Sequence, residues 1–188
     1  ICSFGYCLTD EKFKIIKKED IVINPESKIV LSKKGEVAKI HLAYSQEYFN
    51  KQNPFDFYYP KIKKLLTDRK HVLFGHAIQS DFSYLNIACR RYNLPAIEME
   101  GYDTQKLHHL IYKTPHIESL EKIVEELEIE KDFLYHKSSE DAHATMLVAK
   151  RIFEEYELDF ATFKDKYSDC LVKNICPKPK EKNISRNQ

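Results

Sequence analysis

Residues 71–81 read His-Val-Leu-Phe-Gly-His-Ala-Ile-Gln-Ser-Asp. The apolar run over 71–76 predicts a short buried strand that ends beside a glycine. From Ser80 onward the apolar side chains fall three, four and three positions apart, at Phe82, Leu85, Cys89 and Tyr92. This spacing predicts a helix that Ser80 caps and that carries Asp81 in its first turn.

The same spacing of a histidine five positions before an aspartate occurs again at residues 136–141, His-Lys-Ser-Ser-Glu-Asp. We expect Ser138 to cap a longer helix that runs to Glu155 and holds Glu140 and Asp141 in its first turn, where acids complement the helix dipole. One such spacing carries little weight in a chain with 8 histidines. Two copies, each where a helix begins, indicate a metal-dependent nuclease site.

The remaining elements predict a mixed α/β order. Residues 1–8 alternate and are rich in β-formers, and strand character resumes from Phe13 towards Asn24, which predicts an antiparallel hairpin. Further along the chain we expect a short helix near residues 43–49, a basic amphipathic helix over 57–66, a strand over 97–102 and a helix whose apolar positions are Ile117, Leu120, Val124 and Leu127. A hairpin followed by strands and helices favours one α/β domain over a repeat array or a bundle.

Composition narrows the class of protein. The chain has 188 residues, 43% of them hydrophobic and 31% charged, with a formal net charge of +1. Binding to an anionic polymer would therefore depend on local basic patches, such as the one formed by Lys61, Lys63, Lys64, Arg69 and Lys70. The five cysteines form no C-x-x-C pair, which argues against a disulfide framework or a zinc knuckle. With no apolar run of about 18 residues and no secretion signal, we expect a cytoplasmic protein that makes no membrane contact.

Three side chains suit the hydrolysis of a phosphodiester bond. Two divalent cations can activate the water, stabilise the leaving oxygen and neutralise the phosphate, and hard Mg²⁺ or Mn²⁺ prefers carboxylates such as Asp81 and Asp141. A neutral imidazole just before the second helix, at His136, can take the proton of the attacking water. The simpler reading of each aspartate is an acid that stabilises the start of its helix.

These residues resemble the DnaQ-like (DEDDh) family of 3′-5′ exonucleases, which includes polymerase proofreading subunits and ribonuclease T. Residues 72–82 resemble the family's second motif, Asp103-Thr104 the Asp-Thr after a later strand, and His136 with Asp141 and Ala142 the third motif. The resemblance implies an RNase H-like mixed sheet flanked by helices, two Mg²⁺ or Mn²⁺ ions held by Asp81 and Asp141, and His136 as general base. Ala77 stands where the second motif usually has Asn, and Ser80 where an apolar aromatic residue is common.

The family's first motif, an Asp-x-Glu on the first strand of the sheet, does not occur in this sequence. We expect that strand and its two carboxylates to lie upstream of Ile1, so that residues 1–168 form the exonuclease domain without its first motif and residues 169–188 a basic tail or linker. The expected substrates are single-stranded or frayed 3′ ends of DNA or RNA, and a polymerase or a further domain is an expected partner. The alternative is a catalytically inactive DnaQ-like module that binds nucleic acid or protein. Asp103 with Thr104 is expected to cap a helix and is left outside the catalytic set.

Overall fold

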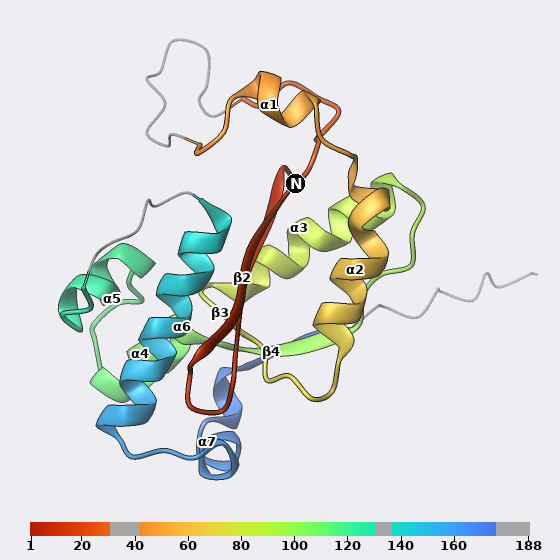
Figure 1. The fold of residues 1–188 in the computed structure, drawn as a ribbon. Helices are drawn as coiled ribbons and strands as arrows, with labels where there is room; N and C mark the ends of the chain where they lie inside the picture. The colour runs from red at the N-terminus through yellow and green to blue at the C-terminus, as the bar shows by residue number, and fades with distance from the viewer. Residues whose placement is uncertain (31–41, 131–136, 176–188) are drawn as a thin grey trace, which may run out of the picture.

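The computed structural model describes residues 1–30, 42–130 and 137–175 (Figure 1). Its elements follow one another in a mixed order, as the sequence predicted. In chain order they are β1 (Ser3–Thr9), β2 (Ile15–Val22), α1 (Gln46–Asn50), α2 (Phe55–Thr67), β3 (Phe74–Gly75), α3 (Ile78–Arg91), β4 (Met99–Asp103), α4 (Thr104–Tyr112), α5 (Leu120–Glu126), α6 (Ser138–Glu155), α7 (Phe160–Lys166), a 3₁₀ turn (Ser168–Cys170) and β5 (Leu171–Asn174).

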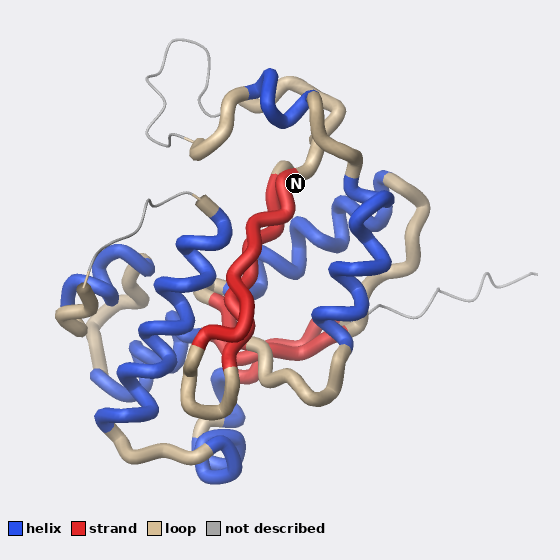
Figure 2. Tube along the Cα trace, viewed as in Figure 1, coloured by secondary structure: helices blue, strands red, loops and turns tan. Residues whose placement is uncertain are grey.

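The strands form two sheets, both drawn in red in Figure 2. β1 and β2 form the antiparallel hairpin predicted from the sequence, with Ser3 paired to Val22. The Asp10 carboxylate closes its turn by accepting from the backbone N–H groups of Lys12 and Lys14. Helices lie on either side of this hairpin, with α2 and α3 on one side and α4, α5 and α6 on the other (Figure 1).

The second sheet has the order β3-β4-β5, with β3 parallel and β5 antiparallel to β4. β5 corrects the expected boundary at residue 168, because Leu171–Asn174 pair along Met99–Tyr102 instead of belonging to a tail. Val172 packs into the core, and the buried Asn174 side chain donates to the carbonyl of Ile97. A strand of 4 residues is too short to give a clear alternating pattern.

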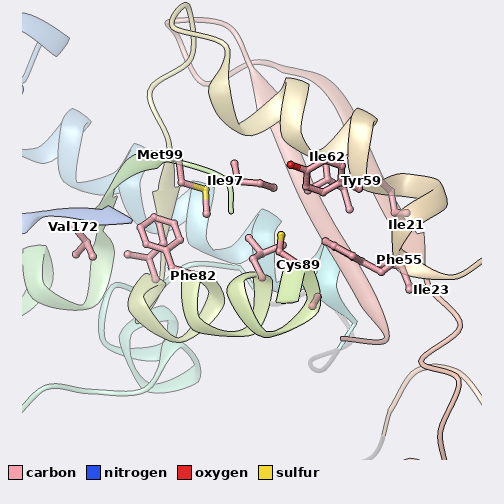
Figure 3. Close-up of a cluster of buried hydrophobic side chains, with 13 residues drawn as sticks. Ile21, Ile23, Phe55, Tyr59, Ile62, Phe82, Cys89, Ile97, Met99 and Val172 are labelled. Atoms are coloured by element: carbon pink, nitrogen blue, oxygen red, sulfur yellow. The ribbon is translucent and has the colours of Figure 1, made fainter. Parts of the chain in front are cut away.

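Two apolar clusters hold these layers together. The first lies between the hairpin, α2 and α3, and Figure 3 shows Phe82 and Cys89 of α3 among its members, together with Phe55, Tyr59 and Ile62 of α2. The second joins α4, α5, α6 and α7. Of the aromatic side chains at the start of α2, Phe55 and Tyr59 are therefore core residues, whereas Phe57 is 64% exposed.

The expected serine caps are wrong at both site helices. α3 begins at Ile78, two residues before Ser80, and the residue that precedes it is Ala77. α6 begins with Ser138 itself, and neither helix has a side-chain cap from the residue before it. The Ser138 hydroxyl instead hydrogen-bonds to the hydroxyl of Ser3, on β1. A contact with a distant strand has thus replaced the local capping bond.

Candidate active site at the starts of two helices

The start of α3 lies directly on the second sheet. Ile78 is 3% exposed and covers two glycines, Gly75 at the end of β3 and Gly101 in β4. A Cβ atom at Gly75 would lie 2.6 Å from Ile78 Cγ1, and one at Gly101 would lie 2.7 Å from Ile78 Cδ1. Such close approach is open only to glycine, so the two glycines fix how near the first turn of α3 sits to the strands.

The turn between β3 and α3 is held by a carboxylate from the neighbouring strand. Ala77 has φ 52° and ψ 41°, a left-handed conformation that is uncommon for a residue with a Cβ. Its backbone N–H donates to Asp103 Oδ1 over 3.1 Å. The same oxygen accepts from the N–H groups of Gln105 and Lys106 and so caps α4, as the sequence predicted for Asp103.

Asp81 stands in the first turn of α3, where the sequence predicted it. The side chain is exposed to solvent, although protein atoms surround it closely enough to disfavour its charged form. This partial desolvation, together with the negative charges of Asp103 and Asp141, raises the pKa of Asp81 to about 6. Three acidic side chains from three separate elements therefore share one electrostatic environment.

Asp141 stands in the first turn of α6 and is half-buried. Its N–H donates to the carbonyl of Lys137 over 3.0 Å, and its carbonyl accepts from the Thr145 hydroxyl over 2.8 Å. The start of α6 lies against β1 at Gly5, where a Cβ atom would meet the backbone of Ser138. Both helices that carry a candidate ligand thus approach their strands over glycines.

The other acid in the first turn of α6 has a different environment. Glu140 pairs with Lys18 of the hairpin over 3.0 Å, and Lys137 lies 3.9 Å away. This pairing ties α6 to β2. The two neighbouring acids therefore differ. Glu140 pairs with Lys18 and anchors the helix, whereas the negative charge of Asp141 contributes to the raised pKa of Asp81.

His76 links the site to the second sheet. Its Nδ1 lies 3.3 Å from Thr104 Oγ1, and the same hydroxyl donates to the carbonyl of Gly75. Burial lowers the pKa of His76, which keeps the ring neutral. These contacts give His76 a structural part at the end of β3. His136, the expected general base, lies outside the described residues.

The carboxylates of Asp81 and Asp141 have the oxygen chemistry that a hard divalent cation prefers. A cation between them would also relieve the repulsion that raises the pKa of Asp81. Across residues 1–30, 42–130 and 137–175, however, no three His, Cys, Asp or Glu side chains are arranged to hold a metal ion. The two aspartates therefore fit part of a cation site, to which further ligands would have to be added.

Asp103 and Thr104, which the sequence predicts as a helix cap and not as catalytic residues, both lie beside the site. Asp103 is 3% exposed and Thr104 is fully buried. A polar pair directly after an apolar strand was the available signal, and it indicated the cap of α4. No local pattern predicts the bond from the Ala77 N–H to Asp103, because that bond joins segments far apart in the chain.

The family described as "DNA polymerase III subunit epsilon-like, C-terminal domain", of the DEDDh type, matches residues 14–152. The chain belongs to this DEDDh family. The matched range includes Asp81, Asp103, His136 and Asp141, and it confirms the resemblance inferred from the motifs.

Solved structures with a similar fold are described as 3′-exonucleases. A full-length 3′-exonuclease is 15% identical to this DEDDh chain, with a TM-score of 0.62 over 89% of this chain and 76% of the other. The nuclease domain of 3′hExo, "a DEDDh family member, bound to rAMP", is 15% identical, with a TM-score of 0.61 over 87% of this chain and 79% of the other. These likenesses confirm the RNase H-like mixed sheet flanked by helices.

A third structure shows a 3′-exonuclease in "3′-end specific recognition of histone mRNA stem-loop". It is 16% identical, with a TM-score of 0.59, and the match covers 76% of the DEDDh chain and 66% of the other.

No curated protein sequence matched the chain. Within the described ranges, no helix combines the length and the apolar character needed to cross a membrane.

Proposed function

We propose that this chain is part of a metal-dependent 3′-5′ exonuclease that hydrolyses phosphodiester bonds of DNA or RNA and releases nucleoside 5′-monophosphates. The observation that carries the proposal is the convergence of Asp81 and Asp141. They come from the first turns of two helices, and the negative charge of Asp141 contributes to the raised pKa of Asp81. The arrangement occurs in a chain of the DEDDh family.

Asp81 and Asp141 are the proposed ligands of two Mg²⁺ or Mn²⁺ ions, with an Asp and a Glu upstream of Ile1 completing the set. When bound, such ions act as Lewis acids that polarise the phosphate and lower the pKa of a coordinated water. The separation of the strands into two sheets supports the proposal of a further strand that carries this Asp and Glu. Within the described part of the chain, β1 pairs only with β2, and β3 only with β4, so each presents a backbone edge that a further strand could use.

His136 is the proposed general base, which takes the proton from the attacking water. An imidazole with a pKa near neutrality is suited to this transfer. His136 precedes α6, the helix that carries Asp141, by two residues. The base and one ligand would therefore be delivered by the same segment.

Nucleic-acid 3′ ends are the proposed substrate. The structural relatives are described with a histone mRNA stem-loop and with rAMP, an RNA end and a mononucleotide. Both ligands present the phosphate and sugar chemistry that the proposed reaction uses. On the chain's own surface, α2 carries the exposed side chains of Phe57, Lys63 and Lys64, an aromatic ring and two cations of the kinds that suit single-stranded nucleic acid.

The test is a time course with 5′-labelled single-stranded DNA and RNA, using the full-length protein in Mn²⁺ or in EDTA. We expect a ladder of products shortened one nucleotide at a time in Mn²⁺ and intact strands in EDTA. His136→Ala should abolish the ladder, whereas His109→Ala, which removes an exposed imidazole from α4, should preserve it. A ladder that persists in EDTA or in His136→Ala would refute the mechanism.

A non-catalytic binding module is the second candidate. It is favoured by the finding that the described residues contain no group of three metal-ligating side chains. In that case the full-length protein would bind labelled strands in a gel-shift assay and leave them uncut in Mn²⁺. Cleavage that requires both Mn²⁺ and His136 would exclude this candidate.

A further inference from the structure

Asp103 and Thr104 hold the segment that leads from β3 into α3. Gly75 on β3 lies opposite Asp103 on β4, and the Thr104 hydroxyl donates to the Gly75 carbonyl over 3.3 Å. The same hydroxyl lies 3.3 Å from His76 Nδ1. One residue further on, the Ala77 N–H donates to Asp103 Oδ1. Three consecutive residues, from Gly75 to Ala77, are thus held from the end of β4.

This linkage is needed because the turn is strained. Ala77 is left-handed, and no side chain caps α3 from its own N-cap position. A non-glycine residue in this conformation persists when its surroundings hold it there. Asp103 does so from a site that is 3% exposed, where its bonds face little competition from water.

The direction of α3 follows from this turn. The Ala77 carbonyl accepts from the Ser80 N–H over 2.9 Å, and Ile78 lies on Gly75 and Gly101. Asp81 is the next residue after Ser80 and follows the same first turn. Release of the Ala77 N–H would let this turn leave the left-handed region and would move Asp81 relative to Asp141.

We propose that Asp103 is a positioning residue of the active site, which sets the place of Asp81 through its hydrogen bond to the strained Ala77 turn. The inference rests on the proposed function, since it assigns Asp81 a catalytic task. Under this proposal Asp103 itself contacts neither the substrate nor a metal ion. It positions Asp81 through the backbone, in addition to the effect of its charge on the pKa of Asp81.

The experiment compares Asp103→Ala with Asp103→Asn and with a matched control, Asp159→Ala, in the full-length protein. Asp159 caps α7 through the Thr162 N–H over 2.8 Å, which is the same kind of bond on a helix that carries no candidate ligand. Hydrogen–deuterium exchange reports the backbone, and kcat and KM on a labelled strand report catalysis. Asparagine keeps an oxygen that can accept from the Ala77 N–H and can cap α4.

We expect Asp103→Ala to speed exchange over residues 77–83 and to lower kcat about tenfold or more, with KM little changed, because a ligand misplaced by about 1 Å can cost that much. Asp103→Asn should recover most of kcat and of the protection. Asp159→Ala should speed exchange only at the start of α7 and leave kcat unchanged. Ala77→Gly should reduce the effect of Asp103→Ala, since glycine adopts the left-handed turn without strain.

Two results separate failure of the inference from failure of the proposed function. If the wild-type protein cuts strands and Asp103→Ala keeps its kcat, or changes exchange only over residues 105–107, Asp103 is merely the cap of α4 and the inference is overturned. If the wild-type protein cuts nothing in Mn²⁺, the proposed function falls and the catalytic role of Asp103 falls with it. Faster exchange over 77–83 in Asp103→Ala would then show that the structural link exists without that task.

Discussion

Ile78 lies on Gly75 so closely that a Cβ atom there would approach Ile78 Cγ1 to 2.6 Å and Ile78 Cβ to 2.9 Å. Ile78 Cβ cannot move without the helix backbone, so Gly75→Ala should push the start of α3 off the sheet. We expect a loss of about 1–3 kcal/mol in the free energy of unfolding, the usual cost of overpacking a core. Urea denaturation followed by circular dichroism measures this change.

The companion substitution Gly101→Ala serves as the comparison. There the nearest atom is Ile78 Cδ1, at 2.7 Å, which is the flexible end of the side chain. Its cost should be the smaller of the two, and Ile78→Val, which removes Cδ1, should recover more stability in Gly101→Ala than in Gly75→Ala. Equal recovery in both backgrounds would contradict the described seating of α3.

Ala77→Asn should stabilise the protein. The residue has φ 52°, and asparagine occupies this region more readily than alanine. We expect a gain of about 1 kcal/mol in the free energy of unfolding, part of the strain that a left-handed residue carries. As a control, Ala88→Asn, in the right-handed interior of α3 and buried, should destabilise. A loss of stability in Ala77→Asn would show that the turn is not strained by alanine.

Asp81→Asn should stabilise the metal-free protein at pH 8 and have no effect at pH 4. The pKa of Asp81 is raised to about 6 in the folded state, above the value of about 3.9 for an unfolded aspartate. Below about pH 4 the Asp81 carboxyl therefore does not lower the free energy of unfolding. It lowers that free energy increasingly as the pH rises from about 4 through about 6. The gain at pH 8 should be about 1 kcal/mol, because solvent screens this exposed group.

Thermal unfolding in EDTA at the two pH values measures this effect, with Asp165→Asn, an exposed change on α7, as control. Added Mg²⁺ should stabilise the wild type and not Asp81→Asn, since the cation binds the carboxylate under the proposed function. An Asp81→Asn variant that is no more stable than the wild type at pH 8 would show that desolvation and the charges of Asp103 and Asp141 do not raise the pKa of Asp81.

His108→Gln should reduce the acid sensitivity of the fold. His108 is 2% exposed, and its burial lowers its pKa although Glu126 lies 3.4 Å from Nε2. The unfolded chain therefore takes up the proton first, and stability present above about pH 6.5 is lost as the pH falls. Urea midpoints at pH 7.5 and 5 should differ less in His108→Gln than in the wild type.

The exposed neighbour supplies the control, because His109→Gln should keep the wild-type difference. Burial also lowers the pKa values of His76 and His143, so the acid sensitivity should be reduced in His108→Gln and not removed. An unchanged difference would mean that His108 titrates alike in the folded and unfolded chains.

Local features of the sequence determined the elements and the places of the candidate ligands along them. The β-formers around the turn at Asp10 predicted the hairpin, and the apolar period after Ser80 predicted α3 with Asp81 in its first turn. The cap of α4 by Asp103 was equally local. Such features depend on side-chain spacing and on bonds within a few residues, which a sequence displays directly.

How these elements meet depends on contacts that form only when the chain folds. The pairing of β5 with β4, the bond from Ser138 to Ser3 and the bond from Ala77 to Asp103 each join residues far apart in the chain. Each replaced a local expectation, either a tail or a serine cap, because packing and buried hydrogen bonds across the fold outweigh the preference of a single residue. For the same reason the sequence predicted Asp81 and Asp141 as acids in the first turns of two separate helices, whereas their electrostatic interaction arises from the fold.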